Sequence, residues 1–466
     1  MEKSSHSQNR RKKPKSGNKP NARVALARQA ALKSLKQVFA GMSLSAVQPQ
    51  FIDTLEDRRD RGLANEIVNG VLRWRWQLEF YTSQLLSKPL KAKDNEVQLI
   101  LLMALYELTE CRTPDYAIIN EAVELVRKSG KKWAASLVNA ILRRFTREKE
   151  QLTAAVEQQK NSDSIRYSHP LWILQKIKTD WPDDWRNILE QNNQRPVFWL
   201  RVNQQQYTAE QYLQLLSEQE IEAAPSPLSE VALKLSQGLD VRTLPGFAEG
   251  AVSVQDVGAQ LCAELLSVED DQRVLDLCAA PGGKACHLLE RYSGIKALLA
   301  VELEEKRMLR VTENLQRLKL EAELVVADAR DHERWWDGTL FDRILIDAPC
   351  SASGVIRRHP DIKSLRRESD IQPLQQLQKE ILTSAWQMLA DGGELLYITC
   401  SIFRDENQNQ MADFFARFSD AEEIKIDAGA GQAWGRACEF GRQLMPGESG
   451  ADGFYFCRLK KTVKKQ

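Results

Sequence analysis

The strongest constraint on the fold is a regular alternation of short apolar runs and helical segments over residues 251–466. The run Ile344-Leu345-Ile346 has no polar interruption, which is typical of a parallel strand covered on both faces. Strands are predicted at Arg273–Cys278, Lys296–Val301, Glu323–Ala327, Phe341–Asp347, Glu394–Cys400 and Gly453–Leu459. Helices are predicted between them at Lys284–Tyr292, Lys306–Leu318, Pro373–Leu389 and Glu406–Phe418. This order predicts an α/β, doubly wound, Rossmann-like parallel sheet that binds its ligand at the carboxyl ends of the strands.

The chain before residue 251 divides into four segments of different character. Residues 1–21 are basic and are predicted to be a disordered tail. Residues 22–152 repeat apolar positions at helical spacing, which predicts an all-α domain. Residues 153–165 are polar and are predicted to be a linker, and residues 166–250 mix strand and helix patterns. We therefore expect a multidomain chain with a small α+β module between the all-α and α/β domains.

Positive charge is concentrated at the start of the chain. The formal net charge is +1, whereas residues 1–20 alone carry seven Lys or Arg and one Glu. This tail is either a solubilising arm or a nonspecific contact for nucleic-acid phosphates, and both interpretations stay open.

Membrane, secreted and metal-binding classes are not favoured. The longest uncharged apolar run, Val97–Tyr106, has ten residues, which is too short to span a bilayer. No apolar signal core is visible near the start of the sequence, and no histidine pair or C-x-x-C has metal-ligand spacing. The eight cysteines are expected to be reduced thiols. We expect a cytoplasmic, monomeric protein without a membrane segment or a metal.

Residues 274–284 combine a strand, a glycine-containing turn and a helix start in the sequence Val-Leu-Asp-Leu-Cys-Ala-Ala-Pro-Gly-Gly-Lys. The turn is neither the G-x-G-x-x-G dinucleotide fingerprint nor a P-loop. Acidic residues lie in or at the ends of three successive strands, at Asp276, Glu302 and Asp328. Acids without a phosphate cradle suit a nucleoside-like cationic ligand such as S-adenosylmethionine. The alternative is that these acids only cap helices.

Two thiols follow neighbouring predicted strands. Asp347 ends one strand and Cys350 follows it after Pro349, while Cys400 ends the next strand. If consecutive strands lie side by side, Cys350 and Cys400 face the same crevice. A structural cysteine and a disulfide are the competing interpretations.

Two thiols beside a methyl donor favour pyrimidine methylation. Carbon 5 of a pyrimidine attacks a methyl sulfonium only after a thiolate has added to carbon 6. An acid near ring nitrogen 3, a role suited to Asp347, would stabilise the charge that develops.

These motifs together resemble those of the RNA 5-methylcytosine methyltransferases, the NOL/NOP/Sun family. The resemblance rests on residues 275–284, on Asp347-Ala-Pro-Cys350 and on Thr399-Cys400-Ser401. It covers about residues 22–460 and is closest to the subfamily that methylates one cytosine of bacterial 16S rRNA. It implies that Cys400 attacks carbon 6, that Cys350 assists product release and that Asp347 contacts the cytosine and closes the cofactor site. It also implies that S-adenosylmethionine is held by Cys278, Ala279, Ala280, Pro281, Gly282, Gly283, Lys284, Glu302, Asp328 and Asp347.

The resemblance extends to RNA binding. The helical segment 22–152 is similar to the RNA-binding NusB domain, and the strand carrying Arg201 and Asn203 resembles an RNA-facing element. Arg357, Arg358 and Lys363 would contact RNA phosphates from one loop. The implied partner is 16S rRNA, either free or in a partly assembled small subunit.

Two alternatives stay open. The catalytic motifs do not choose between rRNA and tRNA, so a tRNA 5-methylcytosine methyltransferase is one of them. The NusB-like segment also allows a noncatalytic RNA-binding assembly factor.

Overall fold

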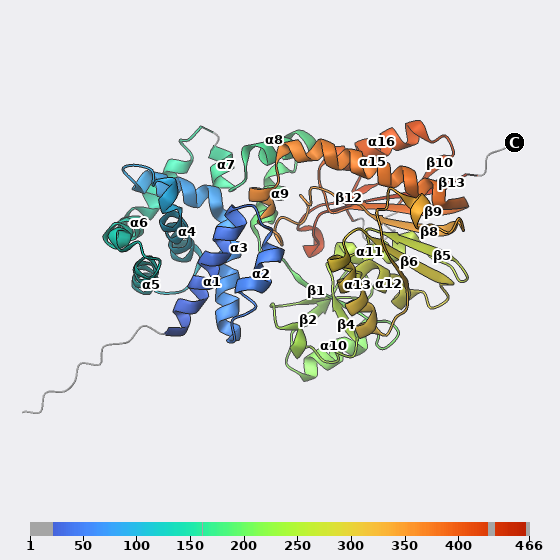
Figure 1. Cartoon of the computed structure of the whole chain (residues 1–466), viewed down its shortest axis with the longest axis horizontal. Coiled ribbons are helices and arrows are strands. Elements are labelled where there is room, and N and C mark those ends of the chain that lie inside the picture. Colours follow the sequence, from blue (N-terminus) through green and yellow to red (C-terminus); the bar gives the residue numbers. More distant parts are fainter. Residues whose placement is uncertain (1–21, 161, 427–433, 463–466) are drawn as a thin grey trace, which may run out of the picture. The chain divides into compact units, whose positions relative to one another are not determined.

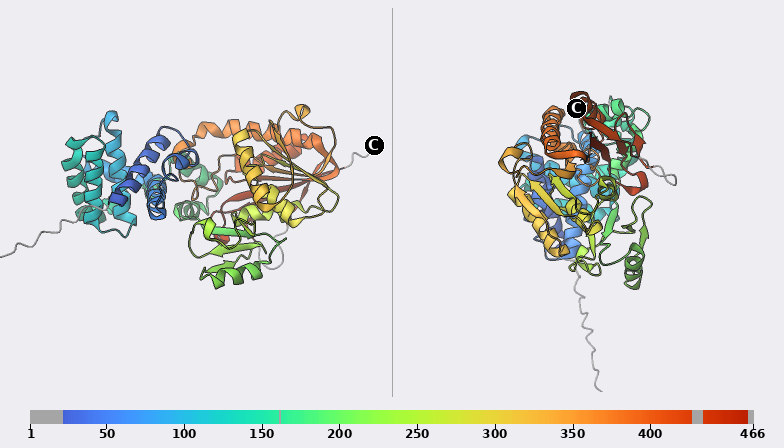
Figure 2. Two further views of the ribbon diagram at one scale, coloured as in Figure 1. Left: turned by 60° about the horizontal axis from the view of Figure 1, so that its bottom comes forward. Right: turned by 90° about the vertical axis from the view of Figure 1, so that its right-hand side faces the viewer.

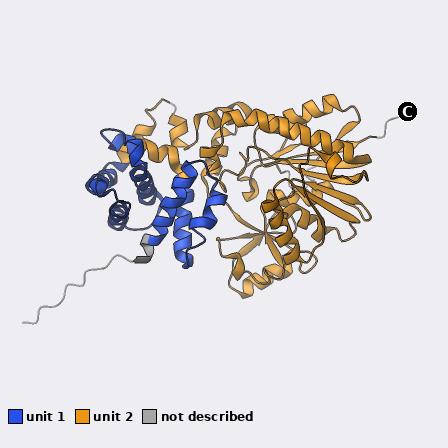
Figure 3. Ribbon diagram, in the orientation of Figure 1, with its two compact units in different colours: residues 1–71, 82–149 blue, residues 72–81, 150–466 orange. Residues whose placement is uncertain are grey.

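The computed structural model describes residues 22–160, 162–426 and 434–462, so the predicted tail 1–21 lies outside the described residues. The chain forms two compact units, residues 1–71 with 82–149 and residues 72–81 with 150–466 (Figure 3). None of the described helices combines the length and the apolar character that a membrane crossing requires.

The first unit is helical, as the sequence predicts. Its helices are α1 (Ala22–Phe39), α2 (Leu44–Phe51), α3 (Arg58–Leu85), α4 (Asn95–Glu110), α5 (Asp115–Lys128) and α6 (Ala135–Val156), and α3 and α6 each also contribute residues to the second unit. Every residue of α4 from Leu99 to Leu108 is buried, so the apolar run is a central core helix. Its one buried carboxylate, Glu107, pairs with Arg28 at 2.5 Å.

The predicted linker 153–165 contains helical turns, and its role as a linker stays a prediction. The last turn of α6 covers residues 153–156, and α7 spans Ser162–Arg166. Leu152 and Val156 are four residues apart and both buried, so they continue the apolar face of α6.

A four-stranded antiparallel sheet forms the small module of the second unit. Its strands are β1 (Phe198–Val202), β2 (Ala223–Pro225), β3 (Ala232–Leu235) and β4 (Val252–Val254), in the order β2-β3-β1-β4. Helix α10 (Ala209–Glu218) packs on this sheet and starts with the predicted capping box of Thr208 and Gln211. Helices α8 (Leu171–Asp180) and α9 (Trp185–Asn193) instead share a core with Ile402 and Phe403.

The large sheet has a parallel part and an antiparallel part. Its strands are β5 (Arg273–Leu277), β6 (Ala297–Glu302), β7 (Glu323–Val326), β8 (Phe341–Asp347), β9 (Leu389–Thr399), β10 (Ala421–Ile424), β11 (Arg436–Ala437), β12 (Arg442–Leu444) and β13 (Phe454–Lys461). Strands β5 to β9 pair in parallel, as predicted. The final strand β13 is antiparallel to β9 and to β12, which corrects the expectation of a wholly parallel sheet. The short connection from β12 to β13 permits only antiparallel pairing.

Helices cover both faces of this sheet (Figures 1 and 2). One face packs against α11 (Val257–Leu266) and α12 (Gly283–Arg291), with α13 (Glu305–Leu318) beside α12. The other face packs against α15 (Ile371–Met388) and α16 (Gln408–Arg417). Along β8, Leu345 points to the first group, and Ile344 and Ile346 point to the second.

The sheet contains a topological switch point. Strand β5 pairs with β6 on one side and with β8 on the other, so the chain winds outward from it in both directions. Ligands of open α/β sheets bind at the carboxyl ends of the strands beside such a point. The predicted cofactor turn follows β5, and both predicted thiols follow the neighbouring strands β8 and β9.

Candidate active site

Cys350 and Cys400 lie side by side. Their Sγ atoms are 3.5 Å apart, and both thiols are free and partly exposed. The register explains the meeting, because Asp347 on β8 is opposite Ile398 on β9, so both chains leave the sheet together. The prediction that the two thiols face one crevice is confirmed, and the disulfide is not formed.

Backbone contacts fix the two thiol-bearing loops. The N–H of Gly354 donates to the carbonyl of Cys400 at 2.9 Å, and the N–H of Gly453 donates to the carbonyl of Gly354 at 2.8 Å. A Cβ added at Gly354 would lie 2.2 Å from the Gly453 oxygen, which is too close for any side chain. Gly354 therefore permits three loops to converge beside the thiols.

The Glu406 carboxylate binds the residues that directly follow the two thiols, and its role was not predicted from the sequence. It is fully buried and accepts hydrogen bonds from the Ser351 N–H at 2.7 Å and from the Ser401 hydroxyl at 2.6 Å. Burial raises the pKa of Glu406, and the hydrogen bonds from the two serines oppose this shift. In the sequence, an acid just before a helix is usually interpreted as a helix cap. The only signal for a role of Glu406 at the site was its position six residues after Cys400.

Asp347 and Lys284 form an ion pair across the crevice. The Nζ of Lys284 lies 2.5 Å from Oδ2 of Asp347. Burial alone would lower the pKa of Lys284, but the adjacent Asp347 carboxylate raises it above its ordinary value. Lys284 is therefore a positively charged partner of Asp347 at the end of β8.

The turn after β5 has an unusual backbone. Cys278 adopts a positive φ of 63° and Gly282 one of 92°, and a Cβ at Gly282 would lie 3.1 Å from the Val311 backbone. A left-handed cysteine at a strand end is uncommon and is typical of a functional turn. Burial, and then Asp347 and Glu302, raise the pKa of Cys278, so its thiol stays protonated and is not a third nucleophile.

The three predicted cofactor acids differ in what they already bind. Asp276 is fully buried, and the group that approaches its carboxylate is the backbone N–H of Ala285, at the start of α12. Burial raises the pKa of Asp276 to about 8, and Lys284 opposes this shift. Glu302 accepts from the N–H groups of Ala280 and Glu304 and from Arg307, which leaves one acceptor position of the carboxylate open.

Asp328 is occupied by an arginine. Its carboxylate accepts the backbone N–H and the guanidinium of Arg330, which lower the pKa of Asp328. Its predicted cofactor contact stays a prediction and requires that Arg330 move. The Asp276 carboxylate and the open acceptor position of Glu302 fit the amino group and hydroxyls of S-adenosylmethionine.

The predicted RNA contacts on β1 are internal, which corrects that expectation. The Arg201 side chain is fully buried, forms two 2.8 Å contacts with Glu290 and donates to the Gly283 carbonyl at 2.6 Å. Asn203 is buried and donates to the Gly250 carbonyl at 3.0 Å. Arg201 therefore connects the small module to the cofactor turn.

The predicted cations of the loop after Cys350 are also used internally. Arg357 and Arg358 share the two oxygens of Asp452 at 2.5 Å each. The ammonium of Lys363 is buried and donates to the Asn193 side chain and to the carbonyls of Arg73 and Ser168. Their expected contact with RNA phosphates is wrong for the buried Arg357 and Lys363, and Arg358, which is 27% exposed, already pairs with two carboxylates.

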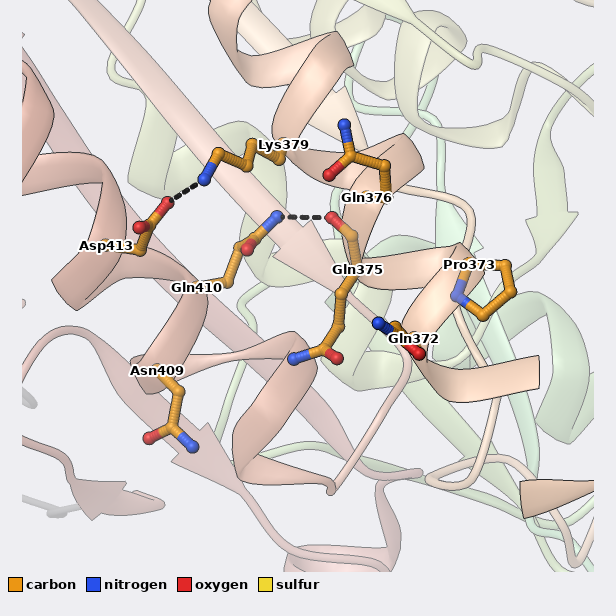
Figure 4. Close-up of a pocket in the computed structure, with 8 residues that line it drawn as sticks. All are labelled: Gln372, Pro373, Gln375, Gln376, Lys379, Asn409, Gln410 and Asp413. Carbon is orange, nitrogen blue, oxygen red and sulfur yellow. Dashed lines mark hydrogen bonds and ion pairs between the residues drawn. The ribbon is translucent and has the colours of Figure 1, made fainter. Parts of the chain in front are cut away.

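A separate pocket of about 500 Å³ lies between α15 and α16 (Figure 4). It is lined by Gln372, Pro373, Gln375, Gln376, Lys379, Asn409, Gln410 and Asp413. Lys379 pairs with Asp413 across it, and Gln410 donates to the Gln375 carbonyl. The lining residues include neither thiol, so this pocket is not the reactive site.

Comparisons with known proteins agree with this geometry. The family model "16S rRNA methyltransferase RsmB/F" matches residues 263–460, "NusB family" matches residues 25–147, and "Methyltr_RsmF/B-like, ferredoxin-like domain" matches residues 169–242. The crystal structure of PH0851 has a TM-score of 0.77 at 21% identity and covers 94% of this chain and 99% of its own. That of NSun6 from Pyrococcus horikoshii with SFG has a TM-score of 0.57 at 19% identity and covers 63% of this chain and 99% of its own.

A curated relative matches almost the whole chain. Ribosomal RNA small subunit methyltransferase B from Pseudomonas putida is 47% identical over 437 residues, which are 94% of this chain and 98% of the relative. An all-α NusB domain, a ferredoxin-like module and a C-terminal methyltransferase domain make up the chain. The chain belongs to the RsmB/F family of 16S rRNA methyltransferases.

Proposed function

We propose that this protein transfers a methyl group from S-adenosylmethionine to carbon 5 of a specific cytosine in small-subunit rRNA. The observation that carries the proposal is the pair of Sγ atoms 3.5 Å apart at the carboxyl edge of the sheet, where Asp347 ends β8. The name of the Pseudomonas putida relative supports rRNA as the substrate. No observation favours tRNA, and the thiol pair argues against a noncatalytic assembly factor.

The reaction begins at Cys400. Its thiolate adds to carbon 6 of the cytosine, forms a carbon–sulfur bond and moves the ring electrons so that carbon 5 becomes nucleophilic. Carbon 5 then takes the methyl group, which the sulfonium of S-adenosylmethionine supplies as an electrophile. A base removes the carbon 5 proton, the electron pair restores the ring double bond, and Cys400 leaves as a thiolate. Cys350, at 3.5 Å, can donate its proton to that leaving sulfur.

Asp347 and Lys284 act on the cytosine ring. Addition of a thiolate places negative charge near nitrogen 3, and a bare carboxylate would repel it. The Lys284 ammonium lies 2.5 Å from Asp347 and supplies a proton to the pair. With that proton, the Asp347–Lys284 pair can donate a hydrogen bond to nitrogen 3 and stabilise the negative charge. The two residues are therefore assigned one role together.

The turn after β5 would hold the cofactor. The Asp276 carboxylate would accept the cationic amino group, and Glu302 has one open position for a ribose hydroxyl. The backbone from Cys278 to Gly283 would allow a ligand to approach closely, because Gly282 is in the left-handed region and has no side chain. Asp328 would join this set after its ion pair with Arg330 opens.

The test is transfer of a labelled methyl group to rRNA followed by mapping of the label. Purified protein is incubated with labelled S-adenosylmethionine and small-subunit rRNA, both free and in partly assembled subunits, with tRNA in parallel. We expect label on carbon 5 of one cytosine of the rRNA. Label only in tRNA would replace the substrate, and no label in any RNA would refute the enzymatic proposal.

A further inference from the structure

Glu406 is a buried acid that binds the residues next to both thiols and has no role in the mechanism above. It ends the short helix η6 (Arg404–Glu406), before α16, and it is fully buried. Its Oε1 accepts from the Ser351 N–H at 2.7 Å and from Gln378 at 3.2 Å, and its Oε2 accepts from the hydroxyls of Ser351 at 2.5 Å and Ser401 at 2.6 Å. One carboxylate thus has all four acceptor positions filled.

These contacts join the two reactive loops through the neighbours of the thiols. Ser351 directly follows Cys350, and Ser401 directly follows Cys400. The two serine hydroxyls also contact each other at 3.1 Å. The parallel strands β8 and β9 bring the loops to one edge of the sheet, but Glu406 binds both loops beyond that edge.

We propose that Glu406 is a positioning residue that fixes the Sγ of Cys350 beside the Sγ of Cys400 by binding Ser351 and Ser401 at the same time. This inference rests on the proposed two-thiol function and deepens it. A buried, fully hydrogen-bonded carboxylate holds its partners more tightly than neutral groups would, because charge-assisted hydrogen bonds are the strong ones. Displacement of a reacting group by about 1 Å can cost about 100-fold in rate.

The charge of Glu406 has a second effect, on the protonation of Cys350. The charged and titratable groups around Cys350 are Tyr397 on β9, Cys400 just after β9, Glu406 on η6, and Arg366, whose guanidinium donates to the Cys350 carbonyl at 3.3 Å. The hydrogen bond with Cys400, then burial, and then the charges of Cys400 and Glu406 raise the pKa of Cys350. Cys350 therefore keeps its proton, as a group that protonates the leaving sulfur must.

The test separates position from charge with two substitutions. Glu406→Gln keeps an acceptor for the Ser351 N–H but removes the charge, whereas Glu406→Ala removes both. Glu423→Gln is the matched control, because Glu423 is also a shielded carboxylate that accepts a backbone N–H, from Gly441 at 2.7 Å. The full-length proteins are treated with iodoacetamide across a pH series without RNA. After trypsin digestion, mass spectrometry follows Cys350 in peptide 344–357 and Cys400 in peptide 380–404.

We expect Glu406→Gln to lower the pH at which Cys350 reacts by about one unit, which is about a tenfold faster reaction at a fixed pH of 8.5. Glu423→Gln should leave the Cys350 profile unchanged. Methyl transfer should fall by about 100-fold or more in Glu406→Ala and by less in Glu406→Gln.

Two results would overturn the inference. One is a Cys350 profile in Glu406→Gln that matches those of the wild type and Glu423→Gln. The other is a wild-type rate of methyl transfer in a folded Glu406→Ala protein. If Glu406→Ala does not fold, the rate of methyl transfer and the Cys350 profile of Glu406→Gln decide together. Failure of the two-thiol function would instead appear as full activity in Cys400→Ala, whatever the alkylation profiles show.

Discussion

Substitution of Arg201 tests whether this residue contacts RNA or forms a buried ion pair that stabilises the fold. Its guanidinium forms two 2.8 Å contacts with Glu290 and further contacts with Gln255 and the Gly283 carbonyl. The side chains of Arg201 and Glu290 are 0% and 2% exposed, so solvent screens the pair very little. Arg201→Met would leave the Glu290 charge buried without its partner.

The expected cost follows from that stranded charge. Removal of one partner of a buried ion pair costs about 3–5 kcal/mol of unfolding free energy, whereas apolar replacement of both partners is often nearly neutral. We therefore expect Arg201→Met to lose about 3–5 kcal/mol and the double variant Arg201→Met with Glu290→Met to recover most of it. Cofactor affinity should fall in the single variant, because Arg201 also binds the Gly283 carbonyl at the start of α12.

Urea unfolding measures the free energies, and hydrogen exchange of peptides from residues 283–290 shows where protection is lost. An RNA-contacting Arg201 would behave differently. Arg201→Met would then keep the stability of the wild type, weaken RNA binding and reduce its salt dependence. That combination of results would refute the assignment of Arg201 as a stabilising residue of the protein interior.

Two further predictions concern Asp276 and the tail. Because burial raises the pKa of Asp276 from 3.8 to about 8, its ionisation destabilises the folded state as the pH rises between these values. Asp276→Asn should therefore raise the Tm, measured in thermal melts, by an amount that grows from pH 4 to pH 8. Calorimetry should show weaker cofactor binding by this variant. A Tm difference that does not change with pH would contradict the prediction. Deletion of residues 2–20 should weaken RNA binding mainly at low salt in filter-binding assays, because their contribution is electrostatic, and equal affinities at low salt would leave a solubilising arm.

Features that depend on neighbouring residues in the chain could be predicted from the sequence. Alternation of apolar runs and helices predicted the parallel strands β5 to β9, and the rule that consecutive strands pair placed Cys350 beside Cys400. The capping box of Thr208 and Gln211 is also a local pattern and was predicted correctly. The direction of β13 was not, because the apolar pattern of a strand does not state its orientation.

The sequence was insufficient where a charge finds its partner far along the chain. Arg201 pairs with Glu290, which is 89 residues away, and Lys363 donates to the Arg73 carbonyl, which is 290 residues away. Cationic residues in a loop are most often exposed, so the sequence around Arg357 favoured a contact with RNA. The structure instead pairs Arg357 with Asp452, which is distant in the sequence. Glu406 escaped notice for the same reason, since its bond with Ser351 spans 55 residues.

The central claim is that Cys400 attacks the cytosine and Cys350 releases it. The most direct measurement incubates Cys350→Ala and Cys400→Ala with rRNA and S-adenosylmethionine and separates the products on a denaturing gel. We predict a stable protein–RNA adduct with Cys350→Ala, because Cys400 still attacks but its release is impaired, and neither adduct nor methylation with Cys400→Ala. A stable adduct with Cys400→Ala and none with Cys350→Ala would reverse the two roles and contradict the claim.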